Sequence, residues 1–398
     1  MNTKKKINVL FVIFSFGTGG SERIVLDLCK GLNRDLFKPF VISFYNNIGS
    51  NDFFRIQHGS ELIEEFNKIK VWNFCLNKRG GVDFKLMKSL SKLISEKNID
   101  VINAHHFSQF FHTCPGAFLN NTSLIYTEHT MHEIRLLPFY WVMIGRFLLK
   151  RCYAVIGISK GCTRQLMETF HVPAHKSFTV LNAIDNIRFE SSINVEAKRR
   201  DIQISKNEKV IGVVGNLREQ KNHANLIKAF KIIKQKVDNI RLLIVGEGPM
   251  GEQLRDLSRK LEIEPFVHFL GARLDIAELY KIMDVYCLSS HYEGLPLTIL
   301  EAMSSKLPVV GTNVVGINDV IIHAQNGILV DPDNPMKLAE AIIYSLENEP
   351  EARKLSENGH LYVQEHHQMT SWIKTYETLF SSASQRSSER RNYSVSHH

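Results

Sequence analysis

The sequence predicts an α/β protein built from two doubly wound parallel sheets, each in a domain of its own. Strand-like and helical segments alternate along the first half of the chain and alternate again along the second half. Repeated strand–helix units favour parallel sheets covered by helices. With 398 residues, the chain also exceeds the size at which a single hydrophobic core usually stops growing.

Short apolar runs mark the strands, and apolar residues recurring every three or four positions mark the helices. In the first half we expect strands at Ile7–Phe14, Pro39–Phe44, Ile69–Phe74, Val101–Ala104, Ser123–Thr127 and Ala154–Ile158, and helices at Glu22–Leu32, Phe84–Lys97 and Lys160–Phe170. In the second half we expect strands at Val210–Val214, Arg241–Val245, Val267–Leu270, Val285–Leu288, Pro308–Thr312 and Gly327–Val330. The helices there are expected at Ala224–Val237, Met250–Leu261, Asp275–Met283, Thr298–Ser305, Pro335–Asn348 and Glu351–Phe380.

We place the first domain at residues 1–190 and the second at residues 191–360, because the polar stretch Asn186–Lys209 separates the two alternating patterns. Residues 361–380 are expected to form a helix. Residues 381–398 are rich in Ser and Arg and poor in apolar side chains, so we expect them to be disordered.

The net charge of +8 is carried by the first half of the chain, where residues 1–190 contain 24 Lys and Arg against 15 Asp and Glu. No nucleic-acid-binding motif accompanies this charge, so attraction to an anionic membrane surface or to a phosphorylated acceptor is favoured. The six cysteines are scattered without a C-x-x-C pair, which fits the cytoplasm. No run of 18 apolar residues predicts a transmembrane helix.

The segment His291–Met303 is the most informative for function. It places Glu293 on the loop after a predicted strand and Glu301 about two turns into the next helix. Open α/β sheets bind ligands at the carboxyl ends of their strands. Because a carboxylate accepts two hydroxyl hydrogen bonds in a fork, this pair suits a polyol such as a ribose or a hexose.

This segment resembles the sugar-donor-binding signature of the family 4 retaining glycosyltransferases, which have the GT-B fold. The resemblance continues through Leu307–Thr312, Val315–Ile321 and Asn326–Pro332, and it runs from about residue 8 to about residue 345. It implies two Rossmann-like domains facing each other across a cleft. The second domain would hold a nucleotide-diphospho-sugar, with UDP favoured, and the first a glycan or lipid-linked acceptor.

The resemblance also implies roles for the residues of this segment. Glu301 would hold the ribose, and Glu293 would hold sugar hydroxyls or assist the departing phosphate. The intervening Gly294, Leu295, Pro296 and Leu297 would line the donor site. The last helix, with Trp372 and Tyr376, would cross back to the first domain.

A basic loop follows the first strand of the second domain. Gly215 and Lys221 match the family pattern, whereas Asn216 stands where the family commonly has an Arg. Arg218 on the same loop could supply the second cation. Two cations facing a diphosphate would stabilise the leaving nucleotide without a metal ion.

Three glycine-containing turns complete the expected donor site. Gly19 and Gly20 open the first helix, where Ser21 is a natural N-cap residue and an acceptor-side candidate. Gly246 and Gly248 follow a strand, and backbone groups near Arg273 are expected to face the base. The turn after the first strand, Phe16–Glu22, lacks the G-x-G-x-x-G dinucleotide pattern, so we do not expect NAD, and we expect no other cofactor.

Three histidines follow strands of the first domain. The resemblance implies that His129 contacts the donor sugar or the acceptor, and His105 and His106 are acceptor-site candidates. The sequence Asp331–Pro332–Asp333 looks like a metal-binding D-x-D motif. Its place between a strand and a helix favours a loop, and we expect no catalytic metal.

The segment Ile134–Arg151 joins apolar and aromatic residues with flanking cations, which suits either a helix at a membrane interface or a helix packed in the first domain. Two other functions stay open. A GT-B sugar-nucleotide epimerase would need no acceptor, and a non-catalytic subunit of a glycan assembly complex would be consistent with Asn216.

Overall fold

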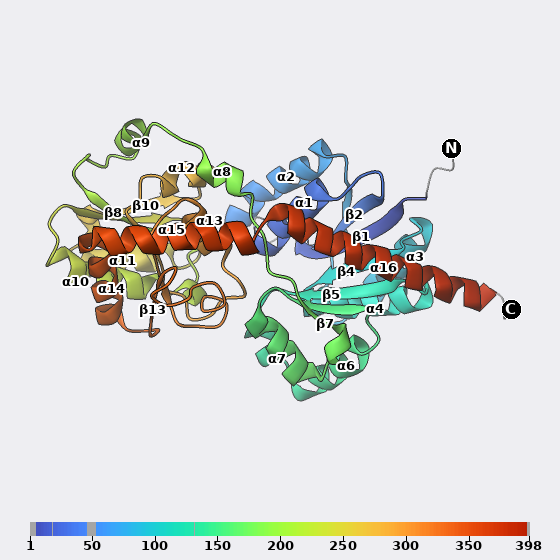
Figure 1. Ribbon diagram of the computed structural model, residues 1–398. Coiled ribbons are helices and arrows are strands. Elements are labelled where there is room, and N and C mark those ends of the chain that lie inside the picture. Colours follow the sequence, from blue (N-terminus) through green and yellow to red (C-terminus); the bar gives the residue numbers. More distant parts are fainter. Residues whose placement is uncertain (1–4, 18, 46–52, 131, 396–398) are drawn as a thin grey trace. The chain divides into compact units, whose positions relative to one another are not determined.

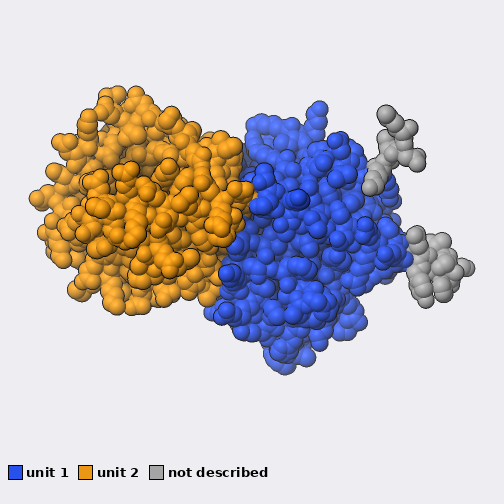
Figure 2. Space-filling view, viewed as in Figure 1, with its two compact units in different colours: residues 1–182, 369–398 blue, residues 183–368 orange. Residues whose placement is uncertain are grey.

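The computed structural model describes residues 5–17, 19–45, 53–130 and 132–395 (Figure 1). The chain forms two compact units, one of residues 1–182 and 369–398 and the other of residues 183–368 (Figure 2). Each unit contains one fully parallel sheet. The predicted fold class of two Rossmann-like domains is therefore confirmed.

The sheet of unit 1 has seven strands in the order β3-β2-β1-β4-β5-β6-β7. They are β1 (Ile7–Ser15), β2 (Phe37–Tyr45), β3 (Trp72–Cys75), β4 (Val101–His105), β5 (Ser123–Glu128), β6 (Ala154–Gly157) and β7 (Ser177–Thr179). The helices are α1 (Gly20–Gly31), α2 (Phe53–Lys68), α3 (Phe84–Glu96), α4 (Phe107–Leu119), α5 (His132–Arg135), α6 (Phe139–Leu149), α7 (Lys160–Phe170) and α16 (Met369–Val395), with a 3₁₀ turn at Ala174–Lys176.

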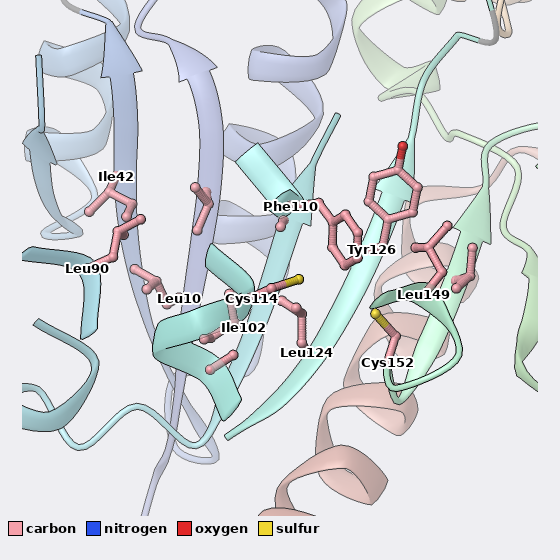
Figure 3. Close-up of a cluster of buried hydrophobic side chains, with 14 of the residues drawn as sticks. Leu10, Ile42, Leu90, Ile102, Phe110, Cys114, Leu124, Tyr126, Leu149 and Cys152 are labelled. Carbon is pink, nitrogen blue, oxygen red and sulfur yellow. The ribbon is translucent and has the colours of Figure 1, made fainter. Parts of the chain in front are cut away.

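Helices cover both faces of this sheet. Leu10 and Val12 of β1 belong to a buried cluster with residues of α3 and α4, and Figure 3 shows this cluster around Phe110 and Cys114. The intervening Phe11 packs edge-on against Phe380 of α16. Because successive side chains of a strand point to opposite faces, α16 lies on the face opposite α3 and α4.

The sheet of unit 2 has six strands in the order β10-β9-β8-β11-β12-β13. They are β8 (Lys209–Val214), β9 (Ile240–Val245), β10 (Val267–Gly271), β11 (Val285–Leu288), β12 (Val309–Thr312) and β13 (Ile328–Val330). The helices are α8 (Asn186–Glu190), α9 (Val195–Asp201), α10 (His223–Lys234), α11 (Gly251–Lys260), α12 (Ile276–Tyr280), α13 (Leu297–Ser304), α14 (Pro335–Glu347) and α15 (Glu349–His366), with 3₁₀ turns at Glu219–Lys221 and Glu264–Phe266.

The predicted domain limits need three corrections. The units divide after Asn182 instead of residue 190, and the polar stretch taken as the boundary contains α8 and α9 of unit 2. The predicted helix Glu351–Phe380 is two helices, because α15 ends at His366 and α16 begins at Met369. Unit 2 accordingly extends to Gln368 instead of residue 360.

The expected disorder of the tail is wrong for residues 381–395, which continue α16 along unit 1. The hydroxyl of Ser387 is buried, accepts a hydrogen bond from the backbone N–H of Ser123 at 2.8 Å and donates one to the carbonyl of Asp100 at 2.8 Å. The guanidinium of Arg391 donates to the carbonyl of Ile99 at 2.5 Å and to the hydroxyl of Thr122 at 3.1 Å. Polar side chains thus attach this segment, which composition alone does not reveal. Residues 396–398 lie outside the described part.

Candidate functional site

The candidate site in unit 2 lies where the strand order of the sheet reverses. The chain goes from β8 to β9 on one side, and β11 pairs with β8 on the other side. Ligands of open parallel sheets bind outside the carboxyl ends of the strands at such a point. The loop 215–221 follows β8 and the loop 289–296 follows β11, so both predicted loops reach this position.

An ion pair joins these two loops. The Nζ atom of Lys221 lies 2.7 Å from Oε1 of Glu293, and the hydroxyl of Ser290 donates to the same oxygen at 2.6 Å. Glu293 is 9% exposed. A carboxylate with two such partners on one oxygen is fixed in place. Among the described residues its second oxygen, Oε2, has no such partner, so it can accept a ligand hydroxyl.

The backbone around Glu293 is held by a close contact with Gly316. Gly316 has φ +90°, and a Cβ atom there would lie 2.6 Å from the carbonyl oxygen of Glu293 and 2.7 Å from that of Gly294. Only glycine meets both requirements without strain. Gly316 therefore allows the loop that carries the ion pair to pack against the segment after β12.

Glu301 is the fifth residue of α13 and is partly exposed. Its Oε2 atom accepts a hydrogen bond from the hydroxyl of Tyr280 at 2.9 Å. Burial and the charge of Glu301 raise the pKa of Tyr280 well above its usual value, so this hydroxyl keeps its proton. The hydroxyl of Tyr280 thus orients one carboxylate oxygen of Glu301. The sequence did not indicate this role of Tyr280.

The glycine turns after β8 and β9 interlock. Gly246 has φ +138°, and a Cβ atom there would lie 2.0 Å from the carbonyl oxygen of Gly215. A Cβ atom on Gly248 would lie 2.5 Å from the carbonyl oxygen of Leu217. The predicted residues Gly215, Gly246 and Gly248 are thus brought together, and their small size lets two backbone segments approach a ligand side by side.

The other predicted donor-site residues of unit 2 differ in exposure. Asn216 and Arg218 are exposed on the loop after β8. Leu295 and Pro296 are buried at the start of α13, and Gly294 and Leu297 are partly exposed. In the part of the chain that the structure describes, no side-chain hydrogen bond caps the N-terminus of α13. Its first N–H groups can therefore serve an anionic ligand.

The guanidinium of Arg273 makes a forked ion pair with Asp275, at 2.8 Å for Nε and 2.6 Å for Nη2. This hydrogen bonding raises the pKa of Arg273. Because Asp275 holds the Arg273 side chain, the groups of this turn that can contact a ligand are those of its backbone. The turn also contributes the carbonyl of Gly271, which accepts from the N–H of Gly246 at 2.8 Å.

In unit 1 the strand order reverses between β1 and β4. Gly19 and Gly20 follow β1, His105 and His106 end β4 or follow it, and His129 follows β5. The predicted residues of unit 1 therefore gather at the carboxyl edge of its sheet, where such sheets bind ligands.

The N-cap assignment of Ser21 is wrong. The N-cap residue of α1 is Gly19, and the hydroxyl of Ser21 donates instead to Oε2 of Glu22 at 2.7 Å. Glu22 is buried, and its carboxylate lies against Gly19, where a Cβ atom would be 2.3 Å from Oε2. A carboxylate near the first turn of a helix is stabilised by the helix dipole. Thr18 of this loop lies outside the described residues.

The histidines form a network with Glu128. The carboxylate of Glu128 accepts hydrogen bonds from the hydroxyl of Tyr126 and from the backbone N–H of His129 at 2.8 Å. His106 Nδ1 lies 3.3 Å from the same carboxylate. The backbone of His106 has φ +68° and ψ 155°, a conformation that is strained for any residue except glycine. Backbone strain of this kind gathers at functional sites.

His105 and His129 are bonded to each other, with 2.7 Å between Nδ1 of His105 and Nε2 of His129. Burial, together with the charge of His106, lowers the pKa of His105 to about 3 and that of His129 well below its usual value. Both rings are therefore neutral near pH 7 and suited to hydrogen bonding with an uncharged hydroxyl.

The D-x-D sequence is a loop, as predicted. Asp331 pairs with Lys337 at 3.1 Å, and Asp333 accepts from the amide of Asn222 at 2.8 Å. Across the described residues, no three His, Cys, Asp or Glu side chains are arranged to hold a metal ion.

Sequence reasoning missed Ser290, Tyr280, Glu128 and Asn103, all of which contact a predicted site residue. Glu128 carries the clearest signal in the sequence, because it ends an apolar strand directly before a histidine, and an acid is seldom buried without a partner. Tyr280 and Asn103 carry none, because their roles depend on neighbours that are distant in the sequence.

Two fully parallel sheets, each in a unit of its own and each with a reversal of strand order, define the chain as a two-domain GT-B protein. Residues 194–361 match the family model described as "Glycosyl transferases group 1", and residues 18–188 match "Glycosyltransferase Family 4". The putative glycosyltransferase EpsD of Bacillus subtilis is 31% identical over 294 residues, which cover 68% of this chain and 74% of EpsD. The chain therefore belongs to the group 1, family 4 glycosyltransferases.

Two further proteins place the chain among its relatives. N-acetyl-alpha-D-glucosaminyl L-malate synthase of Bacillus anthracis is 27% identical over 320 residues, which cover 79% of this chain and 83% of the synthase. The crystal structure of Anabaena HepE in complex with UDP and glucose superposes with a TM-score of 0.82 at 21% identity. It covers 94% of this chain and 100% of HepE. This likeness shows the shared fold.

Proposed function

We propose that the protein transfers a hexose from a nucleotide-diphospho-sugar, with UDP favoured, to a glycan or lipid-linked acceptor, and that the anomeric configuration is retained. The observation that carries the proposal is the Lys221–Glu293 ion pair at the strand-order reversal of unit 2. A UDP-bound relative of the same fold supports the choice of UDP. We further propose a role in making cell-envelope polysaccharide or glycolipid.

Each charged group has a distinct role in this proposal. Glu301 holds the ribose hydroxyls, with its second oxygen fixed by Tyr280. Lys221 and Arg218 offset the charge that develops on the diphosphate as the glycosidic bond breaks, so no metal ion is required. Glu293 fixes Lys221 and accepts a hydrogen bond from a sugar hydroxyl. Gly19 and Gly20 cover the donor diphosphate, and His129 contacts the transferred sugar or the acceptor. Ser21, His105 and His106 serve the acceptor.

The proposal is tested by a thermal-shift panel with UDP, GDP, ADP and NAD, each in excess chelator. A ligand that binds only the folded state adds about 2.7 kcal/mol of stability at 100 times its dissociation constant. We expect one nucleoside diphosphate, UDP, to raise the melting temperature. A shift with NAD alone, or with no nucleotide, would contradict a nucleotide-sugar site.

We also propose that α6 attaches unit 1 to an anionic membrane at its inner, cytoplasmic face, where a lipid-linked acceptor would be presented. Five large apolar residues on one stripe of α6 are exposed, at fractions from 37% to 75%: Phe139, Tyr140, Met143, Ile144 and Phe147. The opposite side of the helix is buried through Gly145 and Leu149. The segment Ile134–Arg151, both ends included, contains no acidic residue and four cations.

An apolar stripe flanked by cations is the pattern of a helix that lies in an anionic lipid interface. In the described residues no helix is both long and apolar enough to cross a membrane. These features support the interfacial alternative that the sequence left open for α6. The six cysteines, which are all free thiols, fit a reducing compartment.

The double substitution Phe139→Ser and Phe147→Ser is expected to weaken binding to vesicles of phosphatidylglycerol and phosphatidylcholine by at least about tenfold. Each buried Phe contributes roughly 1.5–3 kcal/mol of transfer free energy. Sedimentation with the vesicles measures the effect. Phe84→Ser on α3 is the matched control, because Phe84 and Phe139 are both 75% exposed. Equal binding by the double variant and the control would contradict the proposal.

A further inference from the structure

His129 lies at the end of a chain of side-chain hydrogen bonds that starts in the interior of unit 1. The amide Nδ2 of Asn103 donates to Oγ1 of Thr127 at 2.9 Å. The amide Oδ1 of Asn103 lies 3.1 Å from Nε2 of His105, and Nδ1 of His105 lies 2.7 Å from Nε2 of His129. Thr127, Asn103 and His105 are fully buried, and His129 is 8% exposed. This series of hydrogen bonds therefore connects the core of unit 1 to the carboxyl edge of its sheet.

The two imidazole rings are bonded edge to edge. Their planes are inclined by only 21°, and their centroids are 5.1 Å apart. Rings stacked face to face could not bring two nitrogens within 2.7 Å of each other. The contact is a hydrogen bond close to the ring planes, and such a bond between two neutral rings contains one proton.

The amide of Asn103 determines which ring carries this proton. Because its nitrogen is used on Thr127, its oxygen faces His105, so Nε2 of His105 donates. A neutral imidazole has one N–H, which makes Nδ1 of His105 an acceptor. Nε2 of His129 then donates to it, and Nδ1 of His129 keeps its lone pair.

We propose that Thr127, Asn103 and His105 are positioning residues that make His129 a hydrogen-bond acceptor, through Nδ1, for a hydroxyl of the substrate. The inference rests on the proposed function, in which the ligand at this edge is a sugar. The opposite proton order would give His129 an N–H at Nδ1, which suits a phosphate or carboxylate oxygen. The buried amide thus selects a hydroxyl-bearing ligand over an anionic one at this position.

Other groups around His129 are compatible with this assignment. The ring centroids of His106 and His129 lie 5.0 Å apart, and Nδ1 of His106 lies against the carboxylate of Glu128. Glu128 contacts His129 through the backbone N–H of that residue. Within the described part of the protein, the ring of His129 forms its hydrogen bond with the ring of His105. The tautomer of His129 is therefore set by the tautomer of His105.

The test compares Thr127→Val with Thr127→Ser. Valine has nearly the shape of threonine but removes the acceptor of the Asn103 amide, which frees the amide to turn over, whereas serine keeps the oxygen. Nitrogen-15 NMR of the histidine side chains reads the tautomers directly, and His105→Gln and His129→Gln assign the signals. We expect Nε2–H on both rings in the wild type and in Thr127→Ser, and a mixture in Thr127→Val.

The kinetic readout separates this inference from the proposed function. One misdirected hydrogen bond should lower kcat/KM for sugar transfer about three- to tenfold in Thr127→Val, and Thr127→Ser should restore it. The thermal shift with the nucleoside diphosphate should stay unchanged, because that ligand is assigned to unit 2. A proton on Nδ1 of His129 in the wild type, or wild-type tautomers in Thr127→Val, would overturn the inference.

If Thr127→Val fails to fold, the tautomers of the wild type and of Thr127→Ser still decide the assignment. If no nucleotide shifts the melting temperature of the wild type, the proposed function fails. The tautomer assignment is then judged on the NMR signals alone.

Discussion

Replacing Glu293 by Gln is expected to lower kcat/KM for sugar transfer by about 10²–10³, the effect of removing one well-placed electrostatic group from an active site. Glutamine has the size of glutamate, so the loop can keep its shape against Gly316. Its neutral amide can accept a hydrogen bond from Lys221, whose Nζ atom lies 2.7 Å from the carboxylate, but it cannot form the ion pair. The cation would then be held less firmly at the position where it meets the diphosphate.

The matched control is Asp331→Asn, which also removes one negative charge after a strand of the same sheet. Asp331 and its partner Lys337 have side chains that are 65% and 57% exposed, so their ion pair contributes little. We expect activity within about twofold of the wild type for this control. Activity of Glu293→Gln within threefold of the control would contradict the site assignment.

Ending the chain after Phe380 is expected to destabilise unit 1 by about 3 kcal/mol or more. The deletion removes the contacts of Ser387 and Arg391, and it leaves the backbone N–H of Ser123 without its partner. Each buried polar group that loses its partner costs about 1–3 kcal/mol. Urea unfolding followed by tryptophan fluorescence measures the loss in unit 1 alone, because Trp72, Trp141 and Trp372 all lie in that unit.

Two single substitutions locate the effect within the tail. Ser387→Ala should cost about 1–2 kcal/mol, because the hydroxyl that it removes is buried and makes two long-range bonds. Ser388→Ala is the control, since Ser388 is exposed and its hydroxyl, as far as the described residues go, bonds only within its own helix. An unfolding midpoint of the shortened chain equal to that of the full chain would show that residues 381–395 of α16 do not stabilise unit 1.

The regular periodicity of the sequence predicts most of the fold. All six strands of unit 2 were predicted, because buried parallel strands are continuous apolar runs bounded by turn residues. The three-residue strand β7 was not, because Ser177–Thr179 is only partly buried. The helical tail could not be predicted for a different reason. Its polar residues Ser387 and Arg391 stabilise the fold through partners about 270 positions away in the sequence.

The candidate site was predictable to the extent that its residues follow strands. Glu293, Lys221 and the histidines are in this class, and parallel pairing alone brings them to one edge of each sheet. The residues that orient them were not predictable. Tyr280 reaches Glu301 from α12, and Asn103 reaches His105 from within β4, so both contacts depend on the packed structure.

Hydrogen–deuterium exchange of the full chain, with and without the nucleotide that gives the largest thermal shift, tests the central claim most directly. We expect slower exchange in unit 2 at the segments 215–221, 246–250 and 293–301, because ligand contacts suppress local opening there. Protection confined to unit 1, or to segments of unit 2 away from the strand-order reversal, would contradict the claim that these loops hold the nucleotide.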